Sequence, residues 1–423
     1  MQKKWKLSKI YYGWWIVLAC FICAMTTGVV GYGFTAFFNP VIQEFGWSYA
    51  SISLAASIRG AETGLAAPAL GILVDRWGSK WILFAGAILT GLGLIILAQT
   101  SHLAQFYGAF IIISLGTSCC GPGVVNSAIN HWFRRNLGKA TGILAAGFGA
   151  SGLLVPVIYT LIESYGWRGA LVILGIGCMV ICLPLILIVK RTPEQYGYVP
   201  DGDPRPKDIK VSGNPQVGIV PVEVSIDVSG ALKSRAFWHL TLALTLQSIV
   251  VMAVINHIMP YLQNVNIDGT TASYFAGAIP VLSIIGRFGS GWLSDKFNRK
   301  RVIVVSFAIF GIGTLLFDYV RDVNLWLLFL SIPLFSISMG SVITLRAVMS
   351  LEYFCRSRFA TIFGILIGIQ SLGTILGPFL AGWIFDVWNS YHYAWLIFTG
   401  INLISLVLIA TIPRVQVKKA AEV

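Results

Sequence analysis

Residues Gly71 to Lys80 read G-I-L-V-D-R-W-G-S-K, and residues Gly291 to Lys300 read G-W-L-S-D-K-F-N-R-K. Each stretch comes at the end of a long apolar segment, and the second begins 220 positions after the first. The chain therefore carries the same membrane-exit turn twice. Two copies at this separation predict two structurally related halves, as in membrane proteins built from parallel internal repeats.

The composition excludes an ordinary soluble domain. Of 423 residues, 56% are hydrophobic, 11% are charged and 44 are glycine, and the mean hydropathy is +0.78. These values predict a polytopic membrane protein. The first apolar run, from Gly13 to Phe38, follows several lysines. It is too long for a signal peptide and lacks a small-residue cleavage site, so we expect it to be retained as the first membrane helix.

Twelve apolar runs are each long enough to cross about 30 Å of hydrocarbon. They lie at 13–38, 50–74, 81–99, 104–133, 138–162, 170–189, 237–262, 271–293, 302–317, 325–354, 359–385 and 393–412. The predicted fold is an all-α membrane protein with twelve transmembrane helices in two pseudo-symmetric six-helix bundles. We expect the N-terminal bundle at 1–189, a cytoplasmic linker at 190–235, and the C-terminal bundle with a short cytoplasmic tail at 236–423.

The distribution of basic residues predicts the orientation. If both termini are cytoplasmic, the cytoplasmic segments carry 25 Lys and Arg, whereas the opposite loops carry only Arg168 and Arg321. This imbalance follows the positive-inside rule. The net charge of +13 is therefore a topology signal that also attracts anionic lipids. Because the basic residues are scattered over short segments, nucleic-acid binding is disfavoured. We expect an integral protein of the plasma membrane, in a bacterium the inner membrane.

Sequence motifs for enzymatic chemistry are missing from the chain. It has no G-x-x-x-x-G-K-[ST], no H-E-x-x-H and no G-x-S-x-G. The seven cysteines lie in or beside apolar runs without a histidine cluster, which favours packing over metal binding. We therefore expect no enzymatic activity, no cofactor and no metal. Any coupling energy would come from an ion such as a proton or from a counter-substrate.

The repeated turn resembles the signature G-x-L-x-D-R-x-G-x-K of the major facilitator superfamily of transporters. This resemblance implies a gating role for Asp75 and Arg76, and for Asp295 and Lys296 in the second copy. Charges at a helix end can pair with neighbouring dipoles and charges, and these pairs can break when two halves rock. The alternative is that the four residues are ordinary topology charges, and the two copies in register favour the gating interpretation.

Further motifs resemble one branch of that superfamily, the monocarboxylate transporters and their bacterial relatives, including oxalate:formate antiporters. The branch motifs are Y-G-W-W at 12–15, H-W-F-R-R at 131–135, K-A-T-G at 139–142, A-G-F-G-A-S-G at 146–152 and R-T-P-E at 191–194. The glycines of the 146–152 motif are also expected to serve close helix packing directly, because small residues let membrane helices approach closely. The branch resemblance implies transport by symport or antiport.

Charged residues inside the membrane are costly and are the sharpest functional candidates. Arg287 lies eight residues before Asp295, about 12 Å along a helix and so near mid-membrane. The positions three and four residues away on either side hold no acid. A guanidinium there is suited to bidentate recognition of a carboxylate, and Arg287 matches the substrate arginine of related carboxylate transporters. The alternative is a structural arginine bonded to carbonyls of another helix.

Three other charges lie within predicted helices. Arg59 and Glu62 are three residues apart on one helix face and could form a structural ion pair. Glu62 is also the leading candidate for proton coupling or gating, because burial raises the pKa of a carboxylate while a nearby arginine lowers it. Arg346 is closer to the cytoplasmic end of its helix than Arg287. It is a candidate gate or second anion-binding residue, or else structural.

Departures from the family pattern bear on the substrate. Proton-coupled relatives carry an aspartate where this chain has Ser283, and a lysine near the position of Tyr32, so that route of proton symport is in doubt. Oxalate exchangers carry a second cation near the position of Gln370. One central cation favours a monocarboxylate over a dicarboxylate, unless Arg346 supplies the second charge.

Several uncharged polar residues could face a central cavity and hydrogen-bond a substrate. They are Tyr32, Asn126, Asn130, Asn256 and Gln370. A buried amide between membrane helices can equally join the helices to each other. His257, three residues before Pro260, is expected near the outer surface rather than in a proton relay.

The sequence thus predicts a secondary transporter of a small organic anion, with a monocarboxylate favoured. Three alternatives stay open: oxalate/formate-type exchange of a dicarboxylate for a monocarboxylate, a non-transporting membrane sensor, and efflux of another small molecule. Exchange of a dicarboxylate would need two cations in the binding site. A sensor usually has a sizeable extra cytoplasmic domain. Efflux of cationic compounds fits poorly with three arginines inside the membrane.

Overall fold

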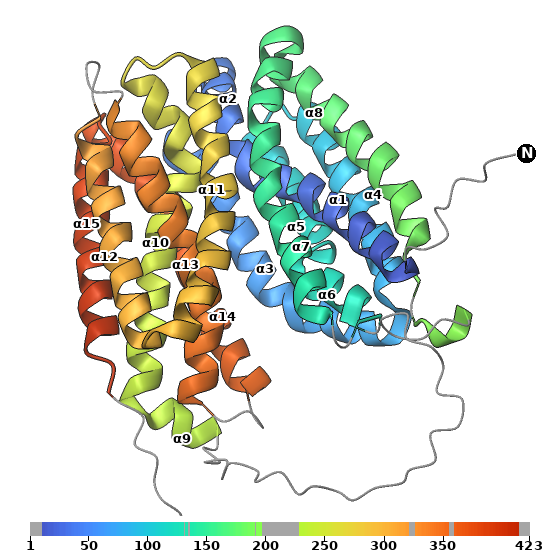
Figure 1. Cartoon of the computed structure of the whole chain (residues 1–423). Helices are drawn as coiled ribbons and strands as arrows, with labels where there is room; N and C mark the ends of the chain where they lie inside the picture. Colours follow the sequence, from blue (N-terminus) through green and yellow to red (C-terminus); the bar gives the residue numbers. More distant parts are fainter. Residues whose placement is uncertain are drawn as a thin grey trace, which may run out of the picture. The chain divides into compact units, whose positions relative to one another are not determined.

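The computed structural model describes residues 11–130, 132–133, 136–190, 192–196, 228–320, 326–354 and 359–413. Within these ranges the regular secondary structure is helical, without strands (Figure 1). Most of the predicted linker at 190–235, part of the 131–135 motif and the predicted C-terminal tail lie outside the described residues. In lipid, helices satisfy every backbone hydrogen bond internally, which is the physical reason for this architecture.

The described residues form the following helices, given in chain order. They are α1 (Tyr12–Gly33), η2 (Phe34–Phe37), α2 (Phe38–Phe45), α3 (Tyr49–Trp77), α4 (Ser79–Ala98), α5 (Leu103–Cys119), α6 (Pro122–Asn130), α7 (Leu137–Ala150), η3 (Ser151–Leu154), α8 (Val155–Ile188), η4 (Glu194–Tyr196), α9 (Val228–Lys233), α10 (Arg235–Asn264), α11 (Gly269–Lys296), α12 (Arg299–Asp318), α13 (Trp326–Tyr353), α14 (Phe359–Trp388) and α15 (His392–Ala410).

These helices account for the twelve predicted spans. Ten segments of the described chain are long and apolar enough to cross a membrane. One of them, Lys139–Ile188, joins the fifth and sixth predicted spans, and Gly166 with φ +69° marks the break between them. The second predicted span is α3, whose 29 residues extend about 44 Å. The all-α membrane fold is therefore confirmed.

Both copies of the repeated turn join one long helix to the next. In the first copy Gly78 lies between α3 and α4 with φ +82°, a left-handed value that favours glycine. In the second copy Asn298 has φ −59°, and its side chain accepts a hydrogen bond from the amide of Arg301 at the start of α12. The two copies therefore form the turn differently. In the first copy glycine adopts a left-handed backbone conformation, and in the second copy asparagine caps the helix that follows.

The described helices group into two compact units. Unit 1 comprises residues 1–31, 65–154 and 161–213, and unit 2 comprises residues 32–64, 155–160 and 214–423. Both α1 and α3 contribute to each unit, because the unit boundaries fall at Gly31 and Gly64 within these helices. The expected bundle boundaries at 189 and 236 stay a prediction.

The core of unit 1 explains the aromatic branch motifs. The Tyr12 hydroxyl donates to the carbonyl of Ile188 at 2.8 Å, and the Trp132 indole donates to the carbonyl of Lys190 at 3.0 Å. The rings of Tyr12 and Trp132 lie 5.4 Å apart, and the Lys190 ammonium lies 4.3 Å from the Tyr12 ring centre. Two motifs and the end of α8 therefore meet in one aromatic cluster. Their direct role is to hold α1 and α8 together.

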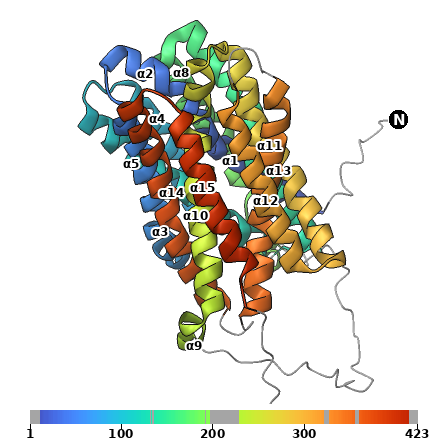
Figure 2. The same cartoon turned by 90° about the vertical axis from the view of Figure 1, so that its left-hand side faces the viewer.

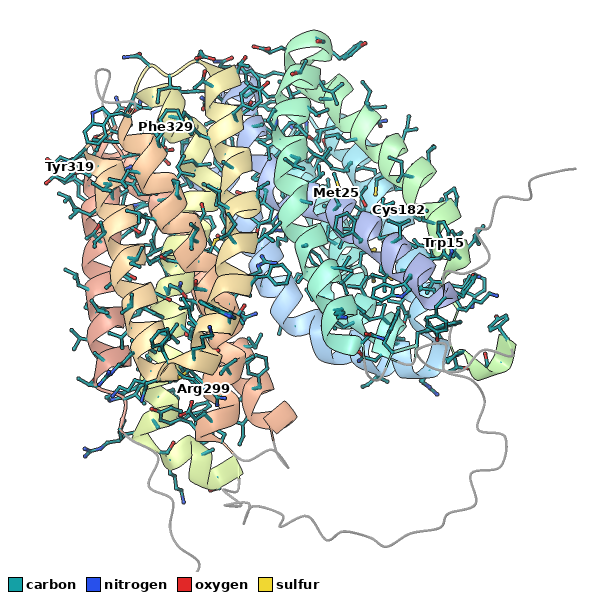
Figure 3. The ribbon with its side chains drawn as sticks, in the orientation of Figure 1. Trp15, Met25, Cys182, Arg299, Tyr319 and Phe329 are labelled. Atoms are coloured by element: carbon teal, nitrogen blue, oxygen red, sulfur yellow. The ribbon has the colours of Figure 1, made fainter. Side chains whose placement is uncertain are left out.

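Free cysteines also belong to the core of unit 1. The six cysteines of the described chain are free thiols and all are buried. Cys182 on α8 faces α1, where its sulfur lies 2.9 Å from the hydroxyl of Thr26 (Figure 3). Groups of His, Cys, Asp or Glu that could hold a metal are not found among the described residues.

Unit 2 contains the helices α10 to α15, which lie side by side (Figures 1 and 2). Within it α11 packs on α13, and α10 packs on α14. A Cβ atom added at Gly286 would overlap the carbonyl of Ile337, and one added at Gly340 would overlap the carbonyl of Ser283. The two backbones can therefore touch only because both positions are glycine.

The N-termini of two helices in unit 2 are capped locally. The Ser234 hydroxyl accepts from the amide of Phe237 at the start of α10, and the Asp268 carboxylate accepts from the amide of Thr271 at the start of α11. The Thr271 amide holds the pKa of Asp268 below its ordinary value. Each cap satisfies a backbone donor that the first helical turn leaves open.

We predict opposite effects for two glycine substitutions on α11. Gly286→Ala should lower the free energy of unfolding by about 1–3 kcal/mol, because the new methyl group forces α11 away from α13. Gly289→Ala is the matched control, since open space surrounds that position and alanine stabilises a helix by about 1 kcal/mol relative to glycine. Thermal melting in detergent would measure both, and equal melting temperatures would contradict the close helix contact.

Candidate functional site

Arg287 is held in unit 2 by the contact between α11 and α13. The Thr344 hydroxyl donates to the backbone carbonyl of Arg287 at 3.2 Å, and the Ser341 hydroxyl donates to the carbonyl of Gly286 at 3.3 Å. The Ser290 hydroxyl in turn donates to the carbonyl of Ser341 at 3.4 Å. Arg287 is half-buried, and its Nε atom is shielded from solvent. The register of α11 on α13 therefore fixes the level of this guanidinium.

Arg346 lies close to Arg287 in unit 2. It is half-buried on α13, two residues beyond Thr344, and its guanidinium is near enough to Arg287 for the two positive charges to repel. Its Nη1 atom donates to Oε1 of Gln370 on α14 at 3.2 Å. From its position in the sequence, Arg346 is expected closer to the cytoplasmic end of its helix than Arg287 is, and separate from Arg287. Helix packing instead brings both arginines and an amide into one cluster from three helices.

The contact between α10 and α14 positions Gln370. The Ser248 hydroxyl on α10 donates to the backbone carbonyl of Gln370 at 3.1 Å. A Cβ atom at Gly373 would overlap the Ser248 hydroxyl, and one at Gly377 would overlap the carbonyl of Ile249. Glycine at these two positions allows α14 to lie directly on α10, which sets the height of the Gln370 side chain beside Arg346.

Asn256, predicted to face a cavity, is 1% exposed on α10. Its amide nitrogen donates to the carbonyl of Met252 one turn earlier at 2.8 Å. Its Oδ1 atom is buried without a hydrogen-bond partner in the described chain. The side chain thus keeps one open acceptor, and its contact with a substrate stays a prediction.

Tyr32, Arg59 and Glu62 also belong to unit 2. The three side chains are half-buried, and the Tyr32 hydroxyl at the end of α1 lies within electrostatic range of Arg59 on α3. The Oε1 atom of Glu62 is shielded from solvent. The predicted pairing of Arg59 with Glu62 and a role of Glu62 in proton coupling stay predictions.

The remaining candidates are spread over other parts of the chain. On α6, in unit 1, Asn126 is half-buried with a buried, unbonded Oδ1 atom among the described residues, whereas Asn130 is exposed. Arg76 is exposed at the end of α3. The Lys296 ammonium lies 4.0 Å from the ring centre of Trp292. The side chains of Asp75 and Asp295 lie outside the described part of the structure.

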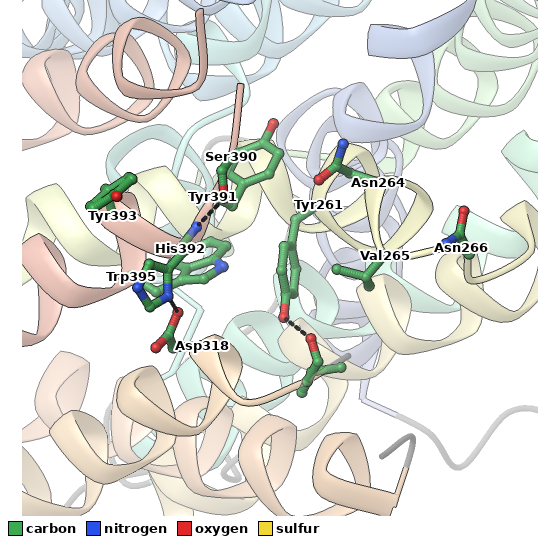
Figure 4. A pocket seen from close by; sticks show the side chains of 11 residues that line it. Tyr261, Asn264, Val265, Asn266, Asp318, Ser390, Tyr391, His392, Tyr393 and Trp395 are labelled. Carbon is green, nitrogen blue, oxygen red and sulfur yellow. Dashed lines mark hydrogen bonds and ion pairs between the residues drawn. The ribbon is translucent and has the colours of Figure 1, made fainter. Parts of the chain in front are cut away.

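A separate pocket of about 480 Å³ opens in unit 2 near the ends of α10 and α12 (Figure 4). Its walls are mainly aromatic and polar. The lining residues are Tyr261, Asn264, Val265, Asn266, Asp318, Val320, Ser390, Tyr391, His392, Tyr393 and Trp395. In it, His392 Nδ1 lies 2.5 Å from a carboxylate oxygen of Asp318. None of the residues predicted from the sequence lines this pocket.

His257 lies about two turns before the end of α10 in a buried polar cluster, and its expected place near the outer surface stays a prediction. It is fully buried on α10 and lies within hydrogen-bond distance of Ser53, Pro378 and Tyr391. Sequence reasoning missed this cluster because its members come from four distant segments. The only available signal was an unusual histidine in an apolar helix.

Comparison with known proteins identifies the family of the chain. The Major Facilitator Superfamily profile matches residues 16–290 and 241–422. The chain is similar to monocarboxylate transporter 12 of Rattus norvegicus, at 24% identity over 91% of this chain and 82% of that protein. It is also similar to monocarboxylate transporter 2 of Homo sapiens, at 26% identity over 91% of this chain and 82% of that protein. The resemblance to this branch is thereby confirmed.

A solved structure shares the fold. The inward-facing, occupied crystal structure of a bacterial homologue of the human lysosomal transporter Spinster matches with a TM-score of 0.70, at 17% identity, over 95% of this chain and 94% of that chain. With this fold, with membrane helices throughout and with a profile that spans nearly its whole length, the chain is an integral membrane protein that belongs to the Major Facilitator Superfamily.

Proposed function

We propose that the protein is a secondary active transporter that moves a small organic anion, a monocarboxylate in the first instance, by alternating access. The observation that carries this proposal is the cluster of Arg287, Arg346 and Gln370, in which two guanidiniums lie within electrostatic range of each other. The similarity to proteins named monocarboxylate transporters supports it.

The electrostatics of the cluster favour an anionic ligand. Two like charges in a membrane bundle repel each other, and the low dielectric strengthens that repulsion. A carboxylate placed between them replaces repulsion by attraction and can accept two parallel hydrogen bonds from a guanidinium fork. Because Gln370 turns its carbonyl oxygen to Arg346, its amide N–H groups can turn to the same ligand.

The other predicted residues take supporting roles in this proposal. Tyr32, Asn126, Asn130 and Asn256 would hydrogen-bond the hydroxyl or keto group of the substrate. Arg59 and Glu62 would serve proton coupling or gating, and the two repeated turns would stabilise closure at their end of the helices. We place both termini in the cytoplasm of a bacterial cell, with the protein in the inner membrane among anionic lipids, because of the distribution of basic residues.

A second candidate function is exchange of a dicarboxylate for a monocarboxylate. The proximity of Arg346 to Arg287 favours it, since two cations can neutralise two carboxylates of one substrate. In that case each guanidinium would bind one end of the dicarboxylate.

We predict that Arg287→Gln reduces uptake of small monocarboxylates into proteoliposomes by about 100-fold, because two charge-assisted hydrogen bonds are lost. Arg287→Lys should recover only part of the rate, since an ammonium lacks the planar fork. The control is Arg235→Gln, which removes an exposed arginine at the start of α10, outside both repeated turns, and should leave uptake unchanged. Normal uptake by Arg287→Gln would refute the substrate role of this residue.

Trans-stimulation distinguishes the two candidate functions. If the arginine pair binds a dicarboxylate, vesicles loaded with a C2 to C4 dicarboxylate should speed monocarboxylate entry. Arg346→Gln should then raise the KM for the dicarboxylate about tenfold, as expected for one lost charge-assisted contact, with a smaller effect on the monocarboxylate. Absence of trans-stimulation by any dicarboxylate would leave monocarboxylate transport as the function.

A further inference from the structure

A buried carboxylate lies in the wall of the pocket near the ends of α10 and α12 (Figure 4). The Asp318 side chain is 6% exposed, and its Oδ1 atom lies 2.5 Å from Nδ1 of His392 at the start of α15. Its second oxygen, Oδ2, makes no hydrogen bond within the described chain. Because buried polar atoms usually have a hydrogen-bond partner, this open acceptor needs an explanation.

The pair of Asp318 and His392 gives the pocket a negative charge. One proton on Nδ1 is enough for His392 to donate to Asp318, and an imidazole with only that proton is neutral. The carboxylate charge then stays uncompensated. Of the described residues that line the pocket, none is a lysine or an arginine. A ligand with a positive charge therefore finds a buried counter-ion here, whereas an anion would be repelled.

Aromatic rings form the floor of the pocket. Tyr261, Tyr391 and Trp395 are each at most 3% exposed, and their ring centres lie between 5.0 and 5.9 Å apart. The Tyr261 hydroxyl donates to the carbonyl of Val320 at 3.3 Å, and the Tyr391 hydroxyl lies 3.0 Å from Nδ1 of His257. Both hydroxyls are thus used on protein atoms, so these residues offer a ligand only ring surface.

The size and the walls of the pocket favour an organic ammonium over a metal ion. Its volume of about 480 Å³ falls in the range of small-molecule sites, roughly 300–1,000 Å³. A metal ion needs several close ligands, and the described residues contain no group of three or more acids, histidines or cysteines that could supply them. Ring surface, by contrast, attracts weakly hydrated organic cations. An N–H of a primary ammonium can also donate to the open Oδ2 atom of Asp318.

We propose that this pocket binds a primary ammonium group, with Asp318 as its counter-ion and the aromatic floor as its apolar wall. The pocket lies wholly in unit 2. It is at the end of α12 opposite to the second repeated turn, and the 20 residues of that helix span about 30 Å. In the proposed orientation it therefore faces the outside of the cell. The inference does not depend on which anion is carried, because the arginine cluster and this pocket prefer opposite charges.

A primary ammonium can reach this pocket from two sources. One is a free amine in the external medium, and the other is the ethanolamine headgroup of a phospholipid. Tyr319, Trp388 and Tyr393 are exposed beside the pocket, and the rings of Trp388 and Tyr393 lie 5.4 Å apart. Membrane proteins place such aromatic side chains at the level of the headgroups. Both sources present the same charge and the same N–H donors, so a binding experiment must separate them.

Calorimetric titration of the purified full-length protein with benzylammonium tests the pocket. In nanodiscs of phosphatidylcholine, whose headgroup has no N–H donor, we expect saturable binding. Benzyl alcohol has nearly the same shape without the charge and should bind more weakly by about tenfold or more, the size expected for one charge-assisted hydrogen bond. Equal binding of the two compounds, or no saturable binding of benzylammonium, would overturn the proposal.

Asp318→Asn removes the charge but keeps the shape of the side chain and an acceptor for His392. It should weaken benzylammonium binding by about tenfold or more and leave benzyl alcohol binding unchanged. The matched control is Asp268→Asn, which removes an exposed negative charge at the start of α11, outside the pocket lining, and keeps a helix cap. It should bind benzylammonium normally. An equal loss in both variants would indicate general electrostatic attraction and would overturn the assignment to this pocket.

Val265→Trp provides an independent variant that keeps every charged group and fills the pocket instead. Val265 is half-buried in the lining, so a larger ring there should abolish saturable binding of benzylammonium. This variant keeps the proposal testable even if Asp318→Asn fails to fold. Unchanged affinity in Val265→Trp would contradict binding in this pocket.

Nanodiscs that contain phosphatidylethanolamine identify the source of the ammonium. If a headgroup occupies the pocket, benzylammonium should bind more weakly there than in phosphatidylcholine, and Asp318→Asn should remove the difference. If the affinity is the same in both lipids, free amines are the ligands. Either result supports an ammonium site. Neither depends on uptake by Arg287→Gln, so failure of the proposed transport function and failure of this pocket are distinguishable.

Discussion

Two positive charges held beside each other in an apolar helical bundle are the main constraint on this structure. An arginine at the centre of a membrane helix costs about 2.5–3.5 kcal/mol on insertion scales, and the proximity of Arg346 to Arg287 adds repulsion. The helices must therefore be held by contacts strong enough to keep both in place. Backbone contact at Gly286 and Gly340 and three hydroxyl-to-carbonyl bonds between α11 and α13 supply those contacts.

The structure uses two different kinds of helix contact. Inside unit 2, α11 on α13 and α10 on α14 meet through glycines with backbone against backbone, a close-packed contact that tolerates little change. The first turn of α3 meets α14 through a close approach at Gly382, through the rings of Tyr49 and Phe385, which lie 4.5 Å apart, and through the exposed Asp386 carboxylate. This second contact therefore combines close packing with a side-chain cap on two backbone amides.

Sequence reasoning succeeded where local pattern decides the structure. Long apolar runs predicted the helices, since only a helix satisfies the backbone in lipid, and the repeated turn predicted a helix-to-helix connection in both halves. From the sequence, the aromatic branch motifs indicated only a family resemblance and no structural role. The structure shows their direct physical role, because Tyr12 and Trp132 meet the end of α8 in one aromatic cluster.

The chain by itself determined the membrane location, the helical architecture, its internal repeat and the identity of the intramembrane charges, because these depend on composition and on spacing along one helix. Only the tertiary structure decided that Arg346 joins Arg287 and Gln370, and that Asp386 reaches the first turn of α3. Those contacts depend on the register between helices far apart in sequence. The positions of glycines that allow two backbones to touch set this register. The spacing of residues within a single helix does not show which helix it will pack against or in what register.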